Sequence, residues 1–412
     1  MAPSRARTTN LLALFLAWCA LLGAGLAGTA PAVAAPRTAA WTEFASGVRY
    51  ATLDLTAAKG PVRAHLLSVD LTEPDVSVGL LHPGAVAARA PLSALADAQG
   101  AVGGVNGDFF NISETQHPGV EATGASVGPA VADGRALKAA VPNGQRFGPA
   151  LPPGTSTEDV LGVGWDDRAR LGALELQGTV TTRGTRLPLG GLNQYALPVG
   201  SVGVFTSDWG AASRLRATCG TDTDRAAPCS AETYEVTVRA GRVTSVAEKP
   251  GGGPITEGTK VLVGREAGAR ELRRLSVGDP VSVRHRLVAE RTQAPYRFAV
   301  GGFPVLRDGV PLDGLDRVAF AVRSAAGIGN DGEELLLMAL DGGPEFRSGL
   351  TVAEVAELMA ELGATDALSL DGGGSSTLVT RSPGDAAVTV RNHPSGGAER
   401  PVPNGIGVFS RD

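Results

Sequence analysis

Short stretches in which apolar and polar residues alternate recur along the chain and predict a protein built mainly from β-strands. Residues 48–55 and 62–69 alternate in this way near the start of the sequence. Residues 234–238 and 242–246 do so further on, and the Ala240-Gly241 pair between them predicts a hairpin. A period of two places one face of each strand against a core. We therefore expect several half-buried strands.

Two segments have the spacing of a helix instead. Residues 91–99 form the first and end before a glycine, and the second begins at Thr351 and stops at Gly363. Thr351 and Glu354 form a capping box at its start. Its apolar face consists of Val352, Val355, Ala356, Leu358, Met359 and Leu362. Helices are few, so we expect an α+β fold: a mixed β-sheet core with few covering helices and a β-rich insertion.

The second helix lies between two apolar runs that each end in Asp-Gly-Gly. The first run reaches Asp341 and the second reaches Asp371. A strand–helix–strand unit typically joins neighbouring parallel strands by a right-handed crossover. Both turns would then emerge at one edge of the sheet, where such sheets bind ligands. Two carboxylates there can serve as acid and base, or can hold a metal.

The turn after Asp371 combines glycines with hydroxyl groups. It contains Gly372, Gly373, Gly374, Ser375, Ser376 and Thr377. Glycines allow positive φ angles and close approach of a ligand, and successive N–H groups can form an anion-binding nest. We therefore expect an anion beside a fixed carboxylate. The alternative is an ordinary glycine-rich turn between two strands.

Four further polar residues are candidates for the site. Asn106 and Asp108 flank Gly107 ahead of two phenylalanines, which predicts either a hairpin turn or two side chains that face a cleft. Arg323 lies among small residues, and its guanidinium suits phosphate or carboxylate oxygens. The alternative for this arginine is a pairing with a structural aspartate. Asn404 precedes a glycine and is either a turn residue or a site ligand.

Composition and charge narrow the possible functions. The 412 residues are 43% hydrophobic and 19% charged, which fits a packed core rather than disorder. The formal net charge is −5, and the sequence has no basic patch of the kind that nucleic-acid binding needs. We therefore expect no nucleic-acid partner.

The N-terminus has the three regions of a secretory signal peptide. Two arginines supply the positive region, residues 11–27 are apolar, and residues 32–34 read Ala-Val-Ala, which fits a cleavage site. We expect residues 1–34 to be removed and the protein to be secreted or extracytoplasmic. The alternative is a retained membrane anchor. Beyond Ala35 no second apolar stretch of membrane-spanning length follows.

Two cysteines remain beyond this leader, Cys219 and Cys229, and they flank a short polar loop. Export places them in an oxidising compartment. We expect a disulfide with a local effect on the order of 2–3 kcal/mol. A thiol nucleophile or a metal site is not indicated by so few cysteines.

Together, these segments resemble the phosphodiester glycosidase family. The resemblance is dense in the C-terminal third and looser toward the first strands. Two departures concern Asp108, where the family more often has glycine, and Ser324, where it commonly has threonine. The first places a carboxylate near the expected site and can alter substrate choice. The matching segments are residues 105–110, 301–306, 323–327, 340–342, 350–363, 371–378 and 399–409.

The resemblance implies one catalytic domain over residues 35–412. Within it, residues 160–290 contain no cluster of catalytic residue types, and we interpret them as a β-rich subdomain that forms scaffold or one wall of the site. Residues 299–412 carry most of the site motifs.

The implied reaction is hydrolysis of a sugar-1-phosphodiester, which releases the sugar and leaves a phosphomonoester. The substrate would be a phosphodiester-linked glycan or a small glycosyl phosphodiester. Arg323, Asp341 and Asp371 would be catalytic, with the acid, base and nucleophile unassigned. The substrate would be bound by Asn106, Asp108, Gly302, Gly372, Gly373, Gly374, Ser375, Ser376, Thr377 and Asn404.

No cofactor is expected, although the paired Asp-Gly-Gly turns are also compatible with a divalent metal. Two other classes of function compete with the glycosidase. A non-catalytic carbohydrate- or envelope-binding protein would tolerate loss of Asp341 or Asp371, and both are present. A metal-dependent phosphodiesterase that cuts the P–O bond would favour acids and histidines in ligand spacing, and the five histidines are scattered.

Overall fold

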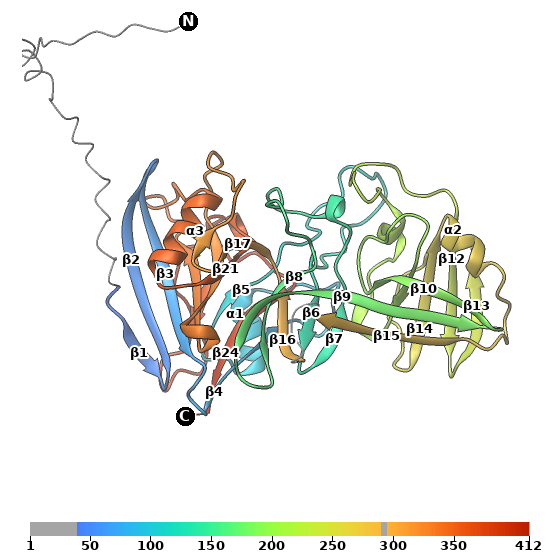
Figure 1. Ribbon diagram of the computed structural model, residues 1–412, viewed down its shortest axis with the longest axis horizontal. Coiled ribbons are helices and arrows are strands. Elements are labelled where there is room, and N and C mark those ends of the chain that lie inside the picture. The colour runs from blue at the N-terminus through green and yellow to red at the C-terminus, as the bar shows by residue number, and fades with distance from the viewer. Residues whose placement is uncertain (1–38, 290–294, 412) are drawn as a thin grey trace, which may run out of the picture. The chain divides into compact units, whose positions relative to one another are not determined.

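The computed structural model describes residues 39–289 and 295–411. The expected signal peptide lies outside the described residues. Three β-sheets make up most of the structure, and few helices accompany them (Figure 1). The α+β expectation is therefore confirmed. None of the helices in the described ranges is long and apolar enough to cross a membrane.

The first sheet has eight strands and carries both Asp-Gly-Gly turns. All of its neighbouring strands pair in an antiparallel manner. Their spatial order is β1 (Thr42–Ala45), β2 (Val48–Ala57), β3 (Gly60–Asp70), β20 (Glu334–Leu340), β19 (Ser324–Gly329), β21 (Asp366–Leu370), β17 (Phe303–Arg307) and β18 (Val310–Pro311).

The expected arrangement of the strand–helix–strand unit is wrong in one respect. β20 and β21 run in the same direction, but β19 lies between them and is antiparallel to both. Its first residue, Ser324, pairs with Ala339 of β20 and with Leu370 of β21. The two turns therefore emerge at the same edge, separated by the start of β19. The sequence between the two runs could not reveal a strand inserted from outside the unit.

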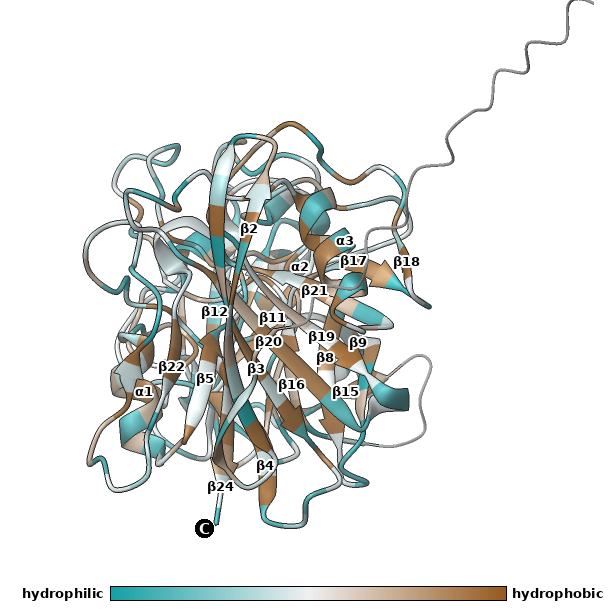
Figure 2. Ribbon diagram, turned by 90° about the vertical axis from the view of Figure 1, so that its left-hand side faces the viewer, coloured by the Kyte–Doolittle hydropathy of each residue, from teal (hydrophilic) through white to brown (hydrophobic). Residues whose placement is uncertain are grey.

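A five-stranded sheet faces this first sheet. Its strands, in spatial order, are β23 (Thr389–Val390), β22 (Leu378–Thr380), β5 (Gly103–Asn106), β24 (Gly405–Ser410) and β4 (Val76–Leu81). Valine, leucine and isoleucine side chains from both sheets and from β8 and β16 share one buried core. In Figure 2 strands such as β4, β16 and β20 are largely brown, which marks hydrophobic residues.

The third sheet has eleven strands and extends from this core. They are β13 (Arg242–Ala247), β12 (Thr233–Arg239), β14 (Thr259–Arg265), β11 (Val202–Phe205), β10 (Thr185–Leu192), β9 (Ala169–Thr182), β8 (Asp159–Gly164), β16 (Tyr296–Gly301), β6 (Ala130–Ala132) and β7 (Arg135–Lys138), with β15 (Ser282–Ala289) beside β9. Only β10 and β11 pair in parallel among the described strands. The hairpin predicted across Ala240-Gly241 joins β12 to β13 and is confirmed.

Three α-helices are present in the described residues: α1 (Leu92–Gln99), α2 (Ala267–Leu272) and α3 (Val352–Glu361). The predicted capping box between Thr351 and Glu354 begins α3. Gly363 has a φ of +99° just after the end of this helix, as a chain reversal there requires. The apolar side of α3 packs on the face of the first sheet that points away from the shared core. The helix thus supports the strands that present the two turns.

Candidate functional site

Asn106 occupies the centre of the polar cluster where the two facing sheets meet. Its side-chain amide donates a 2.7 Å hydrogen bond to the carbonyl oxygen of Asp371. Its side-chain oxygen accepts one from the Ser324 hydroxyl at 2.7 Å and one from the Thr377 amide at 3.1 Å. Asn106 is fully buried. Asn106 therefore links β5, β19 and the glycine-rich turn, and it holds these three segments in position around the site.

The glycine-rich turn folds back onto the same residues. The Asp371 amide bonds to the Gly107 carbonyl, and the Gly373 amide bonds to the Val322 carbonyl at 2.7 Å. Gly373 has a φ of +61°. A Cβ on Gly372 would lie 2.6 Å from the Val322 oxygen, so this close approach needs glycine. The Gly372 amide bonds to the Asp371 carboxylate, so two of the three glycine amides of the expected nest already have partners in this conformation.

Asp371 combines a raised pKa with cationic and hydroxyl neighbours. Burial raises the pKa of this carboxyl to about 6, against the opposing effects of a hydrogen bond from Ser375 and the charge of Arg400. Arg400 in turn donates to the Ser375 hydroxyl at 3.2 Å. A carboxyl with this pKa can carry a proton near neutral pH, which is the requirement for a general acid.

Sequence reasoning missed Arg400. It lies within the matching segment at residues 399–409, between Glu399 and a proline, but its neighbours gave no sign of a role. Glu399 binds the start of α1 through Ser93 at 2.5 Å, which fixes the segment that carries Arg400. The guanidinium then packs against Gly374, where a Cβ would lie 2.5 Å from a terminal nitrogen. This arginine supplies a positive charge next to Asp371, in addition to the hydrogen bond from the Gly372 amide.

Asp108 lies on the other side of Asp371 and is almost completely buried. One of its oxygens accepts a 2.6 Å hydrogen bond from the Gly128 amide, and the other has no partner among the described residues. Its own amide donates to the Asn404 side chain at 3.0 Å. Burial raises the pKa of Asp108, the charge of Lys138 opposes that rise, and the charge of Asp371 adds to it.

Lys138 is the buried cation of this region. Its ammonium donates to the carbonyl oxygens of Val127, Gly128 and Ala139. Burial lowers the pKa of Lys138, and the charge of Asp108 opposes this. All three donors of the ammonium are thus used by the backbone. Lys138 positions the loop that holds Asp108 and does not face a ligand.

Both carboxylate oxygens of Asp341 already accept hydrogen bonds from the protein. Its two oxygens receive hydrogen bonds from the Gly343 amide at 2.7 Å, from the amide and ring Nδ1 of His393 at 3.1 and 2.9 Å, and from His65 Nε2 at 3.2 Å. Burial alone would raise the pKa of Asp341, but these donors together hold it below its usual value. Asp341 is therefore an ionised group that orients histidines, and a proton is poorly held there.

The two histidines around Asp341 differ in exposure. His65 is buried, and its Nδ1 lies 2.7 Å from the Tyr50 hydroxyl. Since ionised Asp341 can only accept, His65 carries its hydrogen on Nε2 and accepts from Tyr50 at Nδ1. Burial lowers the pKa of His65 and agrees with a neutral ring. The side chain of His393 is 78% exposed, so its Nε2 is accessible to substrate or water. Sequence reasoning missed all three residues, because they come from distant segments.

Arg323 points away from this cluster. Its guanidinium donates to the carbonyl oxygens of Leu350 at 3.2 Å and Ala319 at 2.8 Å, and burial lowers its pKa. The next residue, Ser324, faces Asn106, and successive side chains of a strand point to opposite faces. Within the described residues no carboxylate forms an ion pair with Arg323. The alternative considered for this arginine, an ion pair with an aspartate, is therefore absent there, and the guanidinium lies beside the segment that leads into α3.

The other predicted binding residues have packing roles in this conformation. Thr377 and Asn404 hold the backbone around Asn106 and Asp108. Ser376 is fully buried, and its hydroxyl has no partner among the described residues. A Cβ on Gly302 would lie 3.1 Å from the Ser369 carbonyl, so this glycine permits β17 to approach β21.

A buried asparagine joins the two Asp-Gly-Gly turns. The side-chain amide of Asn392 donates to the carbonyl oxygens of Ser376 at 2.8 Å and Leu340 at 3.3 Å. It therefore fixes the turn of Asp371 relative to that of Asp341. Neighbouring strands are about 4.8 Å apart, and with β19 between them the ends of β20 and β21 lie roughly 10 Å apart. The two carboxylates thus act at separate positions along one edge.

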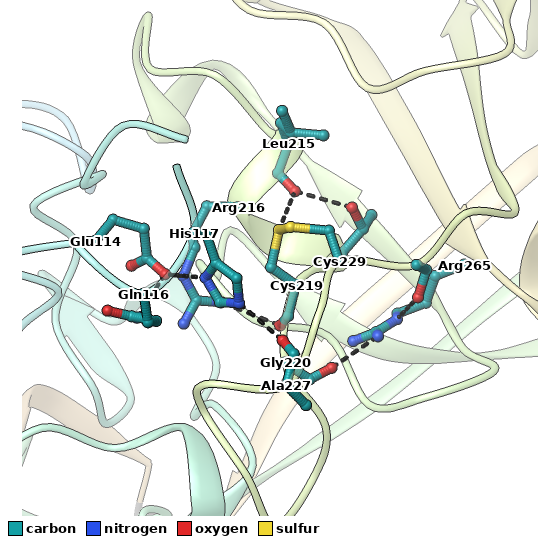
Figure 3. Close-up of a disulfide and its surroundings, with 12 residues drawn as sticks. Glu114, Gln116, His117, Leu215, Arg216, Cys219, Gly220, Ala227, Cys229 and Arg265 are labelled. Carbon is teal, nitrogen blue, oxygen red and sulfur yellow. Dashed lines mark hydrogen bonds and ion pairs between the residues drawn. A yellow bond between two sulfur atoms is a disulfide. The ribbon is translucent and has the colours of Figure 1, made fainter. Parts of the chain in front are cut away.

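The predicted disulfide is confirmed and lies outside this cluster. Cys219 and Cys229 are joined, and Figure 3 shows His117 and Arg265 beside the bond. His117 Nε2 lies 2.7 Å from the Ala227 carbonyl inside the closed loop. Among the described residues, the group with metal-ligand spacing consists of His117 and these two cysteines, whose sulfurs are already bonded to each other.

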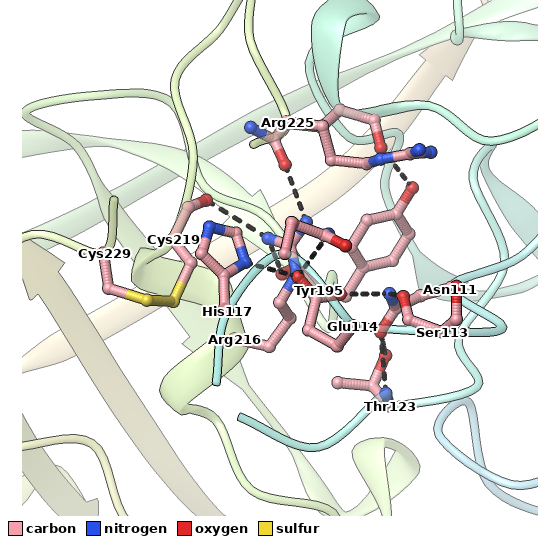
Figure 4. A network of polar contacts seen from close by, with 12 residues as sticks. Asn111, Ser113, Glu114, His117, Thr123, Tyr195, Arg216, Cys219, Arg225 and Cys229 are labelled. Atoms are coloured by element: carbon pink, nitrogen blue, oxygen red, sulfur yellow. Dashed lines mark hydrogen bonds and ion pairs between the residues drawn. A yellow bond between two sulfur atoms is a disulfide. The ribbon is translucent and has the colours of Figure 1, made fainter. Parts of the chain in front are cut away.

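A buried polar network holds this disulfide loop against a second loop. The Glu114 carboxylate accepts hydrogen bonds from His117 at 2.5 Å and Asn111 at 2.7 Å, and it forms an ion pair with Arg216 at 2.5 Å (Figure 4). Arg216 is fully buried and also bonds to the Cys219 carbonyl. Because the charged groups of this network pair with one another inside the protein, we interpret the network as structural.

Comparison with known proteins identifies the chain's relatives. The model of the phosphodiester glycosidase family matches residues 232–409. Over these residues the chain is similar to the phosphodiester glycosidase family. The family region contains Arg323, Asp341, Asp371 and Arg400, whereas Asn106 and Asp108 lie before it. A comparison with curated proteins finds no match.

Two solved structures share this fold, and a third gives a weaker match. A hypothetical protein from Synechocystis has a TM-score of 0.68 and 21% identity over 91% of this chain, which spans 64% of that protein. A putative exported protein from Burkholderia pseudomallei has a TM-score of 0.65 and 24% identity, with 85% and 74% coverage. The zebrafish N-acetylglucosamine-1-phosphodiester alpha-N-acetylglucosaminidase catalytic domain has a TM-score of 0.43 and 15% identity, with 89% and 84% coverage.

Proposed function

We propose that the protein hydrolyses the glycosidic bond of sugar-1-phosphodiesters, with Asp371 as the general acid. The observation that carries the proposal is the position of Asp371. This carboxyl has a pKa raised to about 6 and is adjacent to Ser375 and Arg400 at the sheet edge. The match of residues 232–409 to the phosphodiester glycosidase family supports this substrate class.

The proposed reaction needs little from the protein beyond charge and position. The bond between the anomeric carbon and a phosphate oxygen breaks, and a water oxygen forms the new bond to that carbon. The leaving phosphomonoester gains charge as the bond breaks, because its second pKa is about 6. Arg400 balances that charge, and the Asp371 carboxyl donates the proton.

His393 is the group we propose for activating the water. Asp341 accepts from its Nδ1 at 2.9 Å, which leaves Nε2 free to take a proton from water. Asp341 then serves as a positioning residue. The turns of Asp341 and Asp371 are separated by β19, which leaves room for a water between acid and base. Such a separation favours inversion at the anomeric carbon.

We place this activity outside the cytoplasm. The Cys219–Cys229 disulfide supports an oxidising compartment, and the N-terminal pattern supports export.

Product analysis tests the proposal. The chain from Ala35 onward is incubated with a sugar-1-phosphodiester, with and without a chelator, beside Asp371→Asn. Asp366→Asn is the matched control, because Asp366 begins the same strand at its opposite end. Free sugar with a phosphomonoester, lost in D371N and kept in D366N, is the expected result. Sugar-1-phosphate as the product, or loss of activity with the chelator, would instead favour a metal-dependent phosphodiesterase. Binding of the substrate without turnover would favour a non-catalytic protein.

A further inference from the structure

A hollow of about 780 Å³ opens beside Arg400. Three chain segments and Arg400 with Pro401 form it. Its walls are mainly small apolar side chains, which give space and few hydrogen-bonding groups. The small wall residues are Ala85, Ala87, Ala88, Ala122, Ala211 and Ala212, with the hydroxyl-bearing Thr123 beside them.

Arg400 connects this hollow to the Asp371 site. One of its terminal nitrogens bonds to the Ser375 hydroxyl at 3.2 Å, and Ser375 in turn bonds to Asp371. An arginine has five N–H donors in a planar fork. Among the described residues no carboxylate forms an ion pair with Arg400. Its remaining donors can therefore bind an anion that lies between the site and the hollow.

A second arginine lines the same hollow. Arg89 is exposed, and its guanidinium lies over the Phe110 ring at 5.6 Å from the ring centre. A Cβ on Gly124 would lie 2.9 Å from its Nε, so packing fixes the base of this side chain. No ion pair joins Arg89 to an acid within residues 39–289 and 295–411. Other arginines of the molecule, such as Arg63 with Asp54, are neutralised by a carboxylate.

We propose that this hollow is a subsite for a second phosphate group, carried by the part of the substrate that leaves with the phosphomonoester. Arg89 binds this second phosphate, while Arg400 binds the phosphate at the scissile bond. The preferred substrate is then a glycosyl phosphodiester whose aglycone is itself phosphorylated. The proposal rests on the glycosidase function and names the substrate class of that same site.

The composition of the walls fits such a ligand. Alanine side chains cannot form hydrogen bonds with sugar hydroxyl groups. A ligand in the hollow would therefore be recognised mainly by its charge and its size. Two arginines separated by an apolar surface favour two separate anionic groups over one. A repeating phosphodiester polymer and a small bisphosphate both satisfy this chemistry.

The test compares two substrates that differ by one phosphate. One is a glycosyl-1-phosphoryl-glycerol, and the other carries an additional phosphate on the glycerol. Arg89→Gln should lower kcat/KM for the second about tenfold or more, and should leave the first unchanged. Arg186→Gln, which removes an exposed charge on β10, should change neither. Equal effects of Arg89→Gln on both substrates, or no effect on either, would overturn the subsite.

A binding measurement separates this proposal from the proposed function. Calorimetric titration of glycerol-1,3-bisphosphate and of glycerol-1-phosphate needs no turnover. If the wild type hydrolyses neither substrate, a weaker affinity of Arg89→Gln for the bisphosphate alone still supports the subsite. Identical affinities in wild type and Arg89→Gln would overturn it. Lengthening the substrate by further phosphodiester units then distinguishes a polymer, which gains kcat/KM with length, from a small bisphosphate, which does not.

Discussion

The side-chain amide of Asn106 donates a 2.7 Å hydrogen bond to the carbonyl oxygen of Asp371. The two residues end strands in different sheets, β5 and β21. The bond therefore fixes the proposed acid relative to the facing sheet. A second hydrogen bond of Asn106, from the Ser324 hydroxyl, fixes the same residues relative to β19.

Asn106→Asp should destabilise the fold and abolish activity. The substitution removes both donors of a fully buried amide and leaves the Asp371 carbonyl unpaired, at a cost of about 1–3 kcal/mol. Chemical denaturation monitors the free energy of unfolding. Asn330→Asp, at an exposed turn, is the control and should be neutral. Unchanged stability in N106D would show that Asn106 faces a ligand instead.

The proton on Asp371 should set the alkaline limb of the pH–rate profile. Its folded pKa of about 6 lies above the ordinary value, so the protonated form is lost as pH rises through 6. Turnover should fall over the same interval. Because the pKa of this carboxyl is 3.8 in the unfolded chain and about 6 in the folded one, folding stability falls as pH rises through this interval and stays lower above it.

Asp371→Asn should therefore be inactive yet more stable than the wild type at pH 8. The gain should vanish near pH 4, where the wild-type carboxyl is protonated in the folded state. Thermal unfolding at the two pH values measures this. A variant that is less stable at pH 8 would contradict the assignment.

His393→Gln should lower kcat about 10²-fold or more if His393 activates water. Because its side chain is largely exposed, the variant should fold normally. The loss should fall on kcat and leave KM unchanged, and a purely structural histidine would not produce that split. His285→Gln, in β15, is the control and should keep the wild-type kcat.

Asp341→Asn should change the acid stability of the protein. The folded pKa of Asp341 is depressed, so its contribution is present above the ordinary value of 3.8 and is lost as pH falls through the lower folded pKa. The variant should lose stability at pH 6, where four donors no longer meet a carboxylate, and should differ less from the wild type near pH 2. Equal stability at pH 6 would argue against this role of Asp341 as a hydrogen-bond acceptor.

The disulfide should matter for stability but not for chemistry. Replacing Cys219 and Cys229 by serine removes a cross-link between residues ten apart, which should cost about 2–3 kcal/mol. The bond lies in the His117–Glu114 network, outside the Asp371 cluster. Denaturation and kcat/KM measured on the same sample check both statements. A large loss of kcat/KM in the folded variant would mean that the loop takes part in the site.

Local signals predicted the parts of the fold that depend on neighbours in sequence. The capping box at Thr351 and the hairpin at Ala240-Gly241 are decided by a few adjacent residues. The shared edge of the two Asp-Gly-Gly turns also followed from the repeated pattern. The insertion of β19 between β20 and β21 could not be predicted, since strand order is set by pairing across long sequence separations.

The chemistry of the site was harder to predict for the same reason. Asp341 and Asp371 look alike in sequence, yet four donors keep one ionised while burial favours a proton on the other. One of those donors is the nearby Gly343 amide, but the other three come from residues 65 and 393, far apart along the chain. Arg323 fitted the pattern of an anion ligand but bonds to carbonyl oxygens, while Arg400 gave no signal and lies beside Asp371.

The bond that is broken is the central claim, and hydrolysis in 18O-labelled water tests it most directly. Cleavage between the anomeric carbon and oxygen places the label in the released sugar and none in the phosphomonoester, which is the predicted result. Mass spectrometry of both products from one reaction decides the matter. Label in the phosphate group would mean that the P–O bond is cut, and would contradict the account.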